Sequence, residues 1–124
     1  MTWLAVVLGG AAGTAARHAI NLATTRLVST PVPWATAAVN MIGSLIIGVL
    51  AGGLAAARLP MSPVARTFVF VGILGGFTTF SSLMLDSITL MNAGMPAKAA
   101  LNLVGQMALG LALTVSGYYI GLRL

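Results

Sequence analysis

The chain has 124 residues, of which 59% are hydrophobic and only 6% are charged, and this composition excludes an ordinary soluble globular protein. The absence of cysteine excludes disulfides, thiolate metal sites and cysteine nucleophiles. The net charge of +5 comes from scattered basic residues that form no stripe or arm. We therefore expect these charges to meet lipid headgroups at helix ends, and we expect no nucleic-acid partner.

The apolar residues fall into four blocks, each long enough to cross a bilayer as a helix of roughly 17–25 residues. The expected spans are residues 3–27, 34–57, 67–91 and 97–122, joined by short connections. Nothing is left over for a soluble domain. The sequence therefore predicts one domain over residues 1–124, an all-α membrane protein with four transmembrane helices.

Basic residues are divided almost evenly between the two ends of these spans. Four spans place both termini and the second connection on one side, which then carries Arg58, Arg66 and Arg123. The other side carries Arg26 and Lys98. The positive-inside rule normally fixes orientation by an excess of basic residues on one side. The near balance favours insertion in both orientations and, together with the small size of the chain, an antiparallel homodimer.

The first expected span carries Arg17 and His18 after a glycine-rich run. A charged group within a membrane is costly and tends to pair or to face water. Arg17 either draws anions into a vestibule or is a structural arginine that extends toward the headgroups, and the residues alone leave both interpretations open. His18 has no second nitrogen, sulfur or carboxylate ligand nearby that would make a metal site.

The second expected span places Thr36, Asn40 and Ser44 four residues apart, so these side chains share one helical face. An amide in hydrocarbon must find partners or line water. A single interhelical hydrogen bond would explain Asn40 alone. The whole polar row favours a pathway.

The third expected span contains GILGGFTTFSS at residues 72–82, where glycines and hydroxyls surround two phenylalanines. Gly75 and Gly76 permit the helix to unwind, and threonine hydroxyls can satisfy the freed backbone groups. Free carbonyls would suit a hard cation such as Na⁺, and free N–H groups would suit an anion. We expect a helix broken near its centre beside an ion site, with the ion undetermined and Phe80 in the core.

The fourth expected span carries Asn102 and Gln106 on one helical face. A polar wall and hydrogen-bonded helix packing explain them equally well. No nucleophile–base set, nucleotide loop or pair of carboxylates can be assembled, so an enzyme is not expected. Glycines four residues apart occur in all four spans and favour close packing within one subunit. The pairs are Gly9–Gly13, Gly48–Gly52, Gly72–Gly76 and Gly117–Gly121.

Three segments, in this order and spacing, resemble the Fluc (CrcB) family of small bacterial fluoride channels. GGAAGTAARH at residues 9–18 is similar to the family's glycine-rich first helix, which ends in arginine. TAAVNMIGSLIIG at residues 36–48 is similar to its second-helix motif around an asparagine. GILGGFTTFSS is similar to the break in its third helix, and Asp86 falls where the family often has an acid.

The resemblance implies an antiparallel, dual-topology homodimer with two pores and a structural Na⁺ at its centre. It implies that the carbonyls of Gly75 and Thr78 bind the sodium ion and that the ring edge of Phe80 meets fluoride, which replaces the core assignment of Phe80. The other residues implied for the ion pathway are Arg17, Thr36, Asn40, Thr79, Ser81 and Ser82. The implied function is passive export of fluoride across the bacterial inner membrane.

The chain departs from the family pattern at two places. Leu83 stands where the pattern has a second phenylalanine, and leucine has no polarised ring edge. Asn102 and Gln106 stand where the family usually has a tyrosine and a serine. Both amides can hydrogen-bond an anion, so we expect them to continue the polar track of the ion pathway.

Two other classes of membrane protein share this size. A small multidrug transporter of the proton-coupled type needs a carboxylate at its substrate site, usually in the first span, and this first span has none. A non-conducting assembly subunit would explain the glycine pairs but leaves the composition of residues 72–82 unexplained. Both are therefore ranked below the channel.

Overall fold

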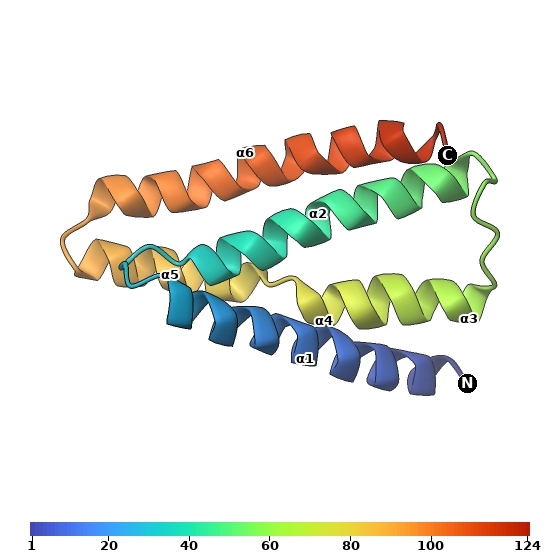
Figure 1. Ribbon diagram of the computed structural model, residues 1–124, viewed down its shortest axis with the longest axis horizontal. Helices are drawn as coiled ribbons and strands as arrows, with labels where there is room; N and C mark the ends of the chain where they lie inside the picture. The colour runs from blue at the N-terminus through green and yellow to red at the C-terminus, as the bar shows by residue number, and fades with distance from the viewer.

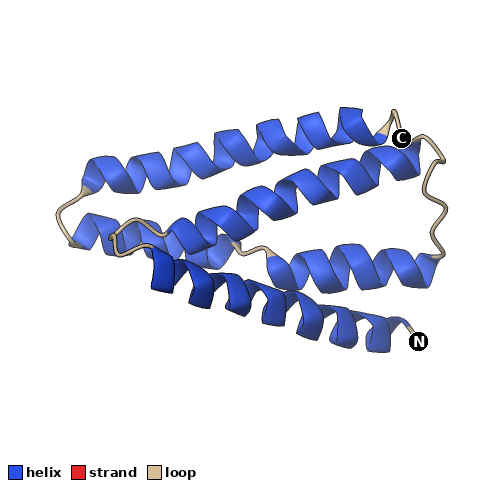
Figure 2. Ribbon diagram, viewed as in Figure 1, coloured by secondary structure: helices blue, strands red, loops and turns tan.

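The computed structural model describes residues 1–124 and contains only helices and the loops that join them (Figure 2). The three long helices are α1 (Thr2–Leu27), α2 (Trp34–Ala55) and α6 (Pro96–Gly121). The third segment of the chain is composite and consists of α3 (Pro63–Arg66), the π-helical η1 (Thr67–Leu74), α4 (Gly75–Phe77) and α5 (Phe80–Asn92). The all-helical class predicted from the sequence is confirmed.

Three segments have the length and composition of a membrane span, namely Trp34–Ala55, Pro63–Asn92 and Pro96–Gly121. Helix α1 is also 26 residues long but is not among them, because Arg17 and His18 make its carboxyl-terminal half more polar. By composition the structure therefore gives three candidate spans where the sequence predicts four.

At two places the helix boundaries differ from those of the expected spans. Helical structure begins at Pro63 instead of residue 67, because the Ser62 hydroxyl accepts a hydrogen bond from the Ala65 N–H at 3.2 Å. Proline is favoured at a first helical position, where its missing N–H would have had no partner. Helix α2 ends at Ala55 because Ala57 takes a left-handed conformation with φ of 54°, which turns the chain out of the helix.

The helices form two parallel pairs that run in opposite directions (Figure 1). Helix α1 lies along η1 and α4, and α2 lies along α6. Both termini and the loop before Pro63 lie at one end of the molecule, and the two remaining connections lie at the other. Because α5 packs on α6 while α4 packs on α1, the third segment passes from one pair to the other.

Glycine-to-backbone contacts join α2 to α6. Gly48 and Gly52 lie directly against the carbonyls of Thr114 and Tyr118. Gly117 and Gly121 of α6 lie in the same way against carbonyls of α2. A methyl group at any of these positions would overlap a backbone atom, so only glycine permits this approach.

The contact of α1 with η1 and α4 uses the same device. Gly9 lies against the Phe68 carbonyl and the Gly72 Cα, and Gly76 lies against the Gly10 backbone. Together with the α2–α6 contact, this confirms the prediction that the glycine pairs pack helices within the subunit.

The outside of this thin bundle is apolar. Only 20 of the 124 residues are buried, and large side chains such as Leu85, Leu101 and Leu111 are mostly exposed. A monomer in water rarely exposes so much contiguous apolar surface. The exposed side chains therefore match a hydrocarbon environment.

Candidate functional site

The backbone of the third segment leaves the helical conformation at two residues, Thr78 and Thr79, which we call the break. Thr78 has φ −81° and ψ 158°, and Thr79 has φ −151° and ψ 117°, so both are extended. Thr79 is the N-cap of α5, because its hydroxyl accepts from the Ser82 N–H at 3.2 Å. Figure 2 shows the break as a loop between two helical stretches.

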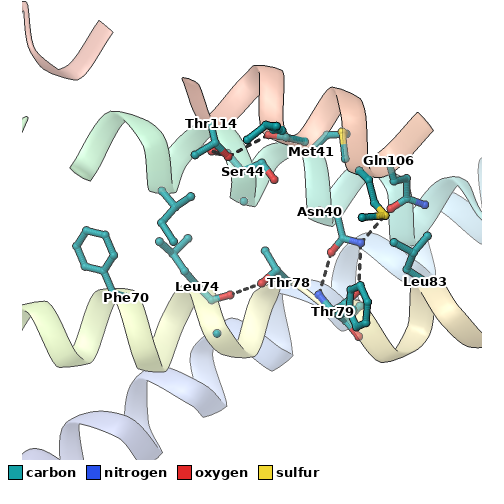
Figure 3. Close-up of a pocket in the computed structure, with 17 residues that line it drawn as sticks. Asn40, Met41, Ser44, Phe70, Leu74, Thr78, Thr79, Leu83, Gln106 and Thr114 are labelled. Atoms are coloured by element: carbon teal, nitrogen blue, oxygen red, sulfur yellow. Dashed lines mark hydrogen bonds between the residues drawn. The ribbon is translucent and has the colours of Figure 1, made fainter. Parts of the chain in front are cut away.

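Asn40 of α2 pairs with the backbone of Thr79. Its Oδ1 accepts from the Thr79 N–H at 2.8 Å, and its Nδ2 donates to the Thr79 carbonyl at 3.1 Å (Figure 3). The side-chain amide thus satisfies both polar groups of one extended residue, as a neighbouring strand would. This pairing compensates the loss of helical hydrogen bonds at the break.

The break also releases the carbonyls that precede it from helical hydrogen bonding, and those of Gly75 and Thr78 are among them. In a continuous helix the Gly75 carbonyl would accept from the Thr79 N–H and the Thr78 carbonyl from the Ser82 N–H. The Thr79 N–H donates to Asn40 instead, and the Ser82 N–H donates to the Thr79 hydroxyl. Gly75 and Thr78, the predicted sodium ligands, therefore hold carbonyls with no helical donor.

A chain of side-chain hydrogen bonds, part-buried at Asn40 and buried beyond it, runs from Asn40 to α5. The Asn40 Nδ2 donates to Gln106 Oε1 at 3.0 Å, and the Gln106 Nε2 donates to Asn102 Oδ1 at 2.8 Å. The Asn102 Nδ2 donates to the Ser87 Oγ at 3.0 Å, and the Ser87 hydroxyl donates to the Leu83 carbonyl at 2.8 Å. We call this the amide chain. It joins α2, α6 and α5.

On one side of the break is a polar cavity of about 410 Å³, which we call the polar vestibule. None of its lining residues is hydrophobic. They are Thr14, Arg17, His18, Asn21, Thr36, Thr79, Ser81 and Ser82. The first turn of α5 borders this cavity, and the N–H groups of a first turn have no helical acceptor. Arg17, hydroxyls and the positive end of a helix dipole make the vestibule suitable for an anion.

At the edge of the vestibule the Thr36 hydroxyl donates to Asp86 Oδ2 at 2.6 Å. Asp86 is the only acid in the chain. Its carboxylate is held between α2 and α5 by this contact and is not among the groups that line the vestibule.

On the other side of the break lies a cavity of about 440 Å³ that opens along the side of the molecule, which we call the open groove (Figure 3). Residues of α2, η1, α4, α5 and α6 line it. Gly75, Thr78 and Phe80 lie on its walls together with Asn40 and Gln106. Phe80 is 67% exposed, which overturns the expectation from residues alone that it is a core side chain. Leu83 also lines the groove but is buried.

The predicted site residues divide between these two cavities. Arg17, Thr36, Ser81 and Ser82 lie in the vestibule, whereas Asn40, Phe80 and Gln106 lie in the groove. Thr79 lines both. Asn102 borders neither and lies buried inside the amide chain.

Sequence reasoning missed four residues of the site. They are Thr14, His18 and Asn21 in the vestibule and Ser87 in the amide chain. The first three share a face of α1 with Arg17, because they follow one another at helical spacing. Their spacing could therefore have identified these three residues from the sequence. Ser87 gave none, since its partner Asn102 lies on another helix.

The fold and the site define a class of protein: a small all-helical membrane protein whose third segment opens at its middle between a polar cavity and a lateral groove. Residues 4–118 match the family described as CrcB-like protein, Camphor Resistance (CrcB). The chain belongs to this family, which confirms the resemblance that the motifs indicated.

Curated relatives cover nearly the whole chain. A protein from Maridesulfovibrio salexigens is 41% identical over 96% of this chain and 94% of its own length. Proteins from Nitrobacter winogradskyi and Hyphomonas neptunium are 39% and 42% identical, over 97% of this chain and over 97% and 91% of their own lengths. All three bear the name Fluoride-specific ion channel FluC. The family is one of ion channels, so the prediction that the chain is not an enzyme is confirmed.

Proposed function

We propose that this chain forms a fluoride-selective channel. The name of its relatives points to fluoride, and the observation that carries the proposal is the break, which lies between an anion-suited vestibule and the open groove. Neither alternative function is favoured, since α1 has no acid and Asp86 is engaged by Thr36.

The proposed path begins in the polar vestibule. Arg17 raises the local concentration of anions by its charge, and the hydroxyls of Ser81 and Ser82 replace water around the ion. Thr79 lies at the boundary of both cavities, so the path passes it and reaches Phe80. There the positive ring edge faces the anion in a dry environment. Asn40 and Thr36 belong to the wall of this path.

The open groove suggests what completes the pathway. Phe80 and the released carbonyls would face lipid if the chain acted alone, and polar backbone is not left facing lipid within a membrane. A second copy in antiparallel orientation covers the groove. In each copy, α1 acts as the fourth span. The nearly even distribution of basic residues permits this arrangement. The dimer has two pores, one for each vestibule.

A structural Na⁺ at the dimer centre fits the residues present. Gly75 and Thr78 of one chain offer two carbonyl oxygens without helical donors, and oxygen ligands suit a hard cation. Two copies would supply four. Bound there, the ion would hold the two breaks together by charge.

In the cell, the channel would let fluoride leave the cytoplasm passively through the inner membrane. Such conduction needs no proton-coupling acid within the path.

Flux from liposomes tests the proposal. Purified chain is reconstituted in vesicles loaded with fluoride or chloride, and efflux is followed with ion-selective electrodes, with Na⁺ or N-methylglucamine as the cation. We expect fluoride efflux without chloride efflux, and faster efflux with Na⁺. Fluoride retention equal to that of protein-free vesicles, from a folded sample, would refute the channel.

Phe80→Ile tests the path within the groove. We expect fluoride efflux to fall about fivefold, because an aromatic contact is worth roughly 1 kcal/mol. The matched control is Leu85→Ile, since Leu85 is on the same helix and 66% exposed but lines neither cavity. If both variants conduct like the parent chain, Phe80 is a lipid-facing residue.

A further inference from the structure

The amide of Asn40 has no free donor in this structure. One hydrogen of Nδ2 goes to the Thr79 carbonyl and the other to Gln106 Oε1. A side-chain amide carries two donor hydrogens, so both are used. A passing anion could gain a hydrogen bond from Asn40 only if the break or the amide chain gave one up.

The direction of the amide chain is fixed at its two ends. At one end the Thr79 N–H can only donate, and at the other the Leu83 carbonyl can only accept. Every link between them donates in the same sense, from Asn40 through Gln106 and Asn102 to Ser87. Reversing any one amide would place two donors or two acceptors face to face.

Burial makes such a reversal costly. Ser87, Gln106 and Asn102 are 7%, 8% and 9% exposed, so little water reaches them to replace a lost partner. A buried polar group without a partner costs more than its hydrogen bond contributes. Linked amides also polarise one another, which strengthens the chain beyond its separate bonds.

We propose that Gln106 is a positioning residue, which orients the Asn40 amide so that Asn40 pairs with Thr79 and keeps the break open. Asn102 and Ser87 orient Gln106 in turn. This proposal refines the proposed function, on which its consequence for transport rests. Asn40 and the two α6 amides shape the path. The Thr79 hydroxyl donates to Ser82 Oγ at 3.0 Å, so the hydroxyls of Ser81 and Ser82 remain as the donors that meet the ion.

Hydrogen exchange of the Thr79 amide tests this role directly. The chain is labelled with ¹⁵N-threonine in lipid nanodiscs, and exchange into D₂O is followed for the parent and three variants. Gln106→Met keeps the length of the side chain but removes both hydrogen bonds. In Gln106→Glu, the protonated carboxyl group keeps an oxygen that can accept from Asn40 and an O–H that can donate to Asn102. Thr89→Val is the control, because Thr89 bonds only the Leu85 carbonyl within α5.

We expect Thr79 to exchange about tenfold faster in Gln106→Met, the effect of losing one hydrogen bond of ordinary strength. Gln106→Glu should restore slow exchange, and Thr89→Val should not change it. Fluoride efflux should fall in Gln106→Met and stay at the parent's level in Thr89→Val. If Gln106→Met does not fold, Gln106→Asn replaces it, since the shorter amide cannot reach both partners.

Parent-like exchange at Thr79 in Gln106→Met or its replacement would overturn the positioning role. Failure of Gln106→Glu to restore slow exchange at Thr79 would also overturn the positioning role. Faster exchange with unchanged efflux would keep the positioning role and instead remove Asn40 from the fluoride path. A parent chain that moved no fluoride would refute the channel without touching the exchange result.

Discussion

The polar vestibule and the open groove are similar in volume, about 410 and 440 Å³, yet opposite in chemistry. The vestibule has no hydrophobic lining residue, whereas eight of the 17 residues that line the groove are hydrophobic. Donors gather around the vestibule: Arg17, hydroxyls and the start of α5. Two of the released carbonyls belong to the groove residues Gly75 and Thr78. One interruption of a helix thus supplies an anion-suited surface on one side and a cation-suited surface on the other.

The contrast between the two cavities arises at Thr79. Thr79 contributes to both cavities, and its own N–H and carbonyl are taken by Asn40. The polar groups that remain available to an ion belong to nearby residues. They are the hydroxyl of Ser81, which lines the vestibule, and the carbonyl of Gly75, which lines the groove. Asn40 lines the groove, and by pairing with Thr79 it maintains the contrast between the cavities.

Removing Asn40 should have the largest effect, because it abolishes that contrast. Asn40→Leu leaves the Thr79 N–H and carbonyl without partners, at a cost of about 3 kcal/mol in stability. We expect fluoride efflux to fall on the order of a hundredfold as the break closes or collapses. Thermal unfolding in detergent and liposome flux measure the two effects. Ile42→Leu on the same helix is the control, and a parent-like result for Asn40→Leu would show that the break holds without the amide.

Arg17→Gln tests the vestibule alone and should have an intermediate effect. Loss of the charge lowers the local anion concentration, so efflux should fall about tenfold at low ionic strength. The loss should shrink as salt rises, because screening already weakens the parent's attraction. Arg26→Gln removes an equal charge outside the vestibule and should leave efflux unchanged. A deficit that does not vary with salt would assign Arg17 a structural role instead.

Leu83→Phe tests the groove alone and should have the smallest effect. Leu83 is buried but borders the groove, so the larger ring has space to enter it. We expect efflux to rise about twofold, the kinetic equivalent of a weak aromatic contact. Efflux is measured for Leu83→Phe in the parent chain and in the Phe80→Ile variant, which shows whether the effects of the two rings on efflux are additive. A slower variant would indicate that the ring obstructs the path.

Local sequence patterns predicted much of this fold. The apolar blocks give the helices, and glycines four residues apart give the contacts of α2 with α6. Glycines and threonines at residues 72–82 indicate irregular backbone, and the two extended residues lie in that stretch. Ser62 followed by Pro63 is also a sequence signal for the start of a helix. The expected span began later, at residue 67, because its bounds were set by the apolar block.

The connections within the site could not be read in this way. Asn40 meets Thr79, 39 residues later, and Gln106, 66 residues later. Helical spacing shows that Asn102 and Gln106 share a face but not which helix that face meets. Such partners depend on how the helices pack, which no local pattern encodes. The residues alone therefore left two interpretations of the α6 amides equally well supported, a polar wall and hydrogen-bonded helix packing.

The glycine contacts described for the fold have a mechanical consequence. Backbone carbonyls lie directly against Gly48 and Gly52 of α2 and against Gly117 and Gly121 of α6. Carbonyls of η1 lie in the same way against Gly9 and Gly13 of α1, so neither pair can slide or tilt without collision. Each pair behaves as one stiff body. The two bodies share a single covalent joint inside the bundle, at Thr78 and Thr79, so any motion that changes the width of the path is concentrated there.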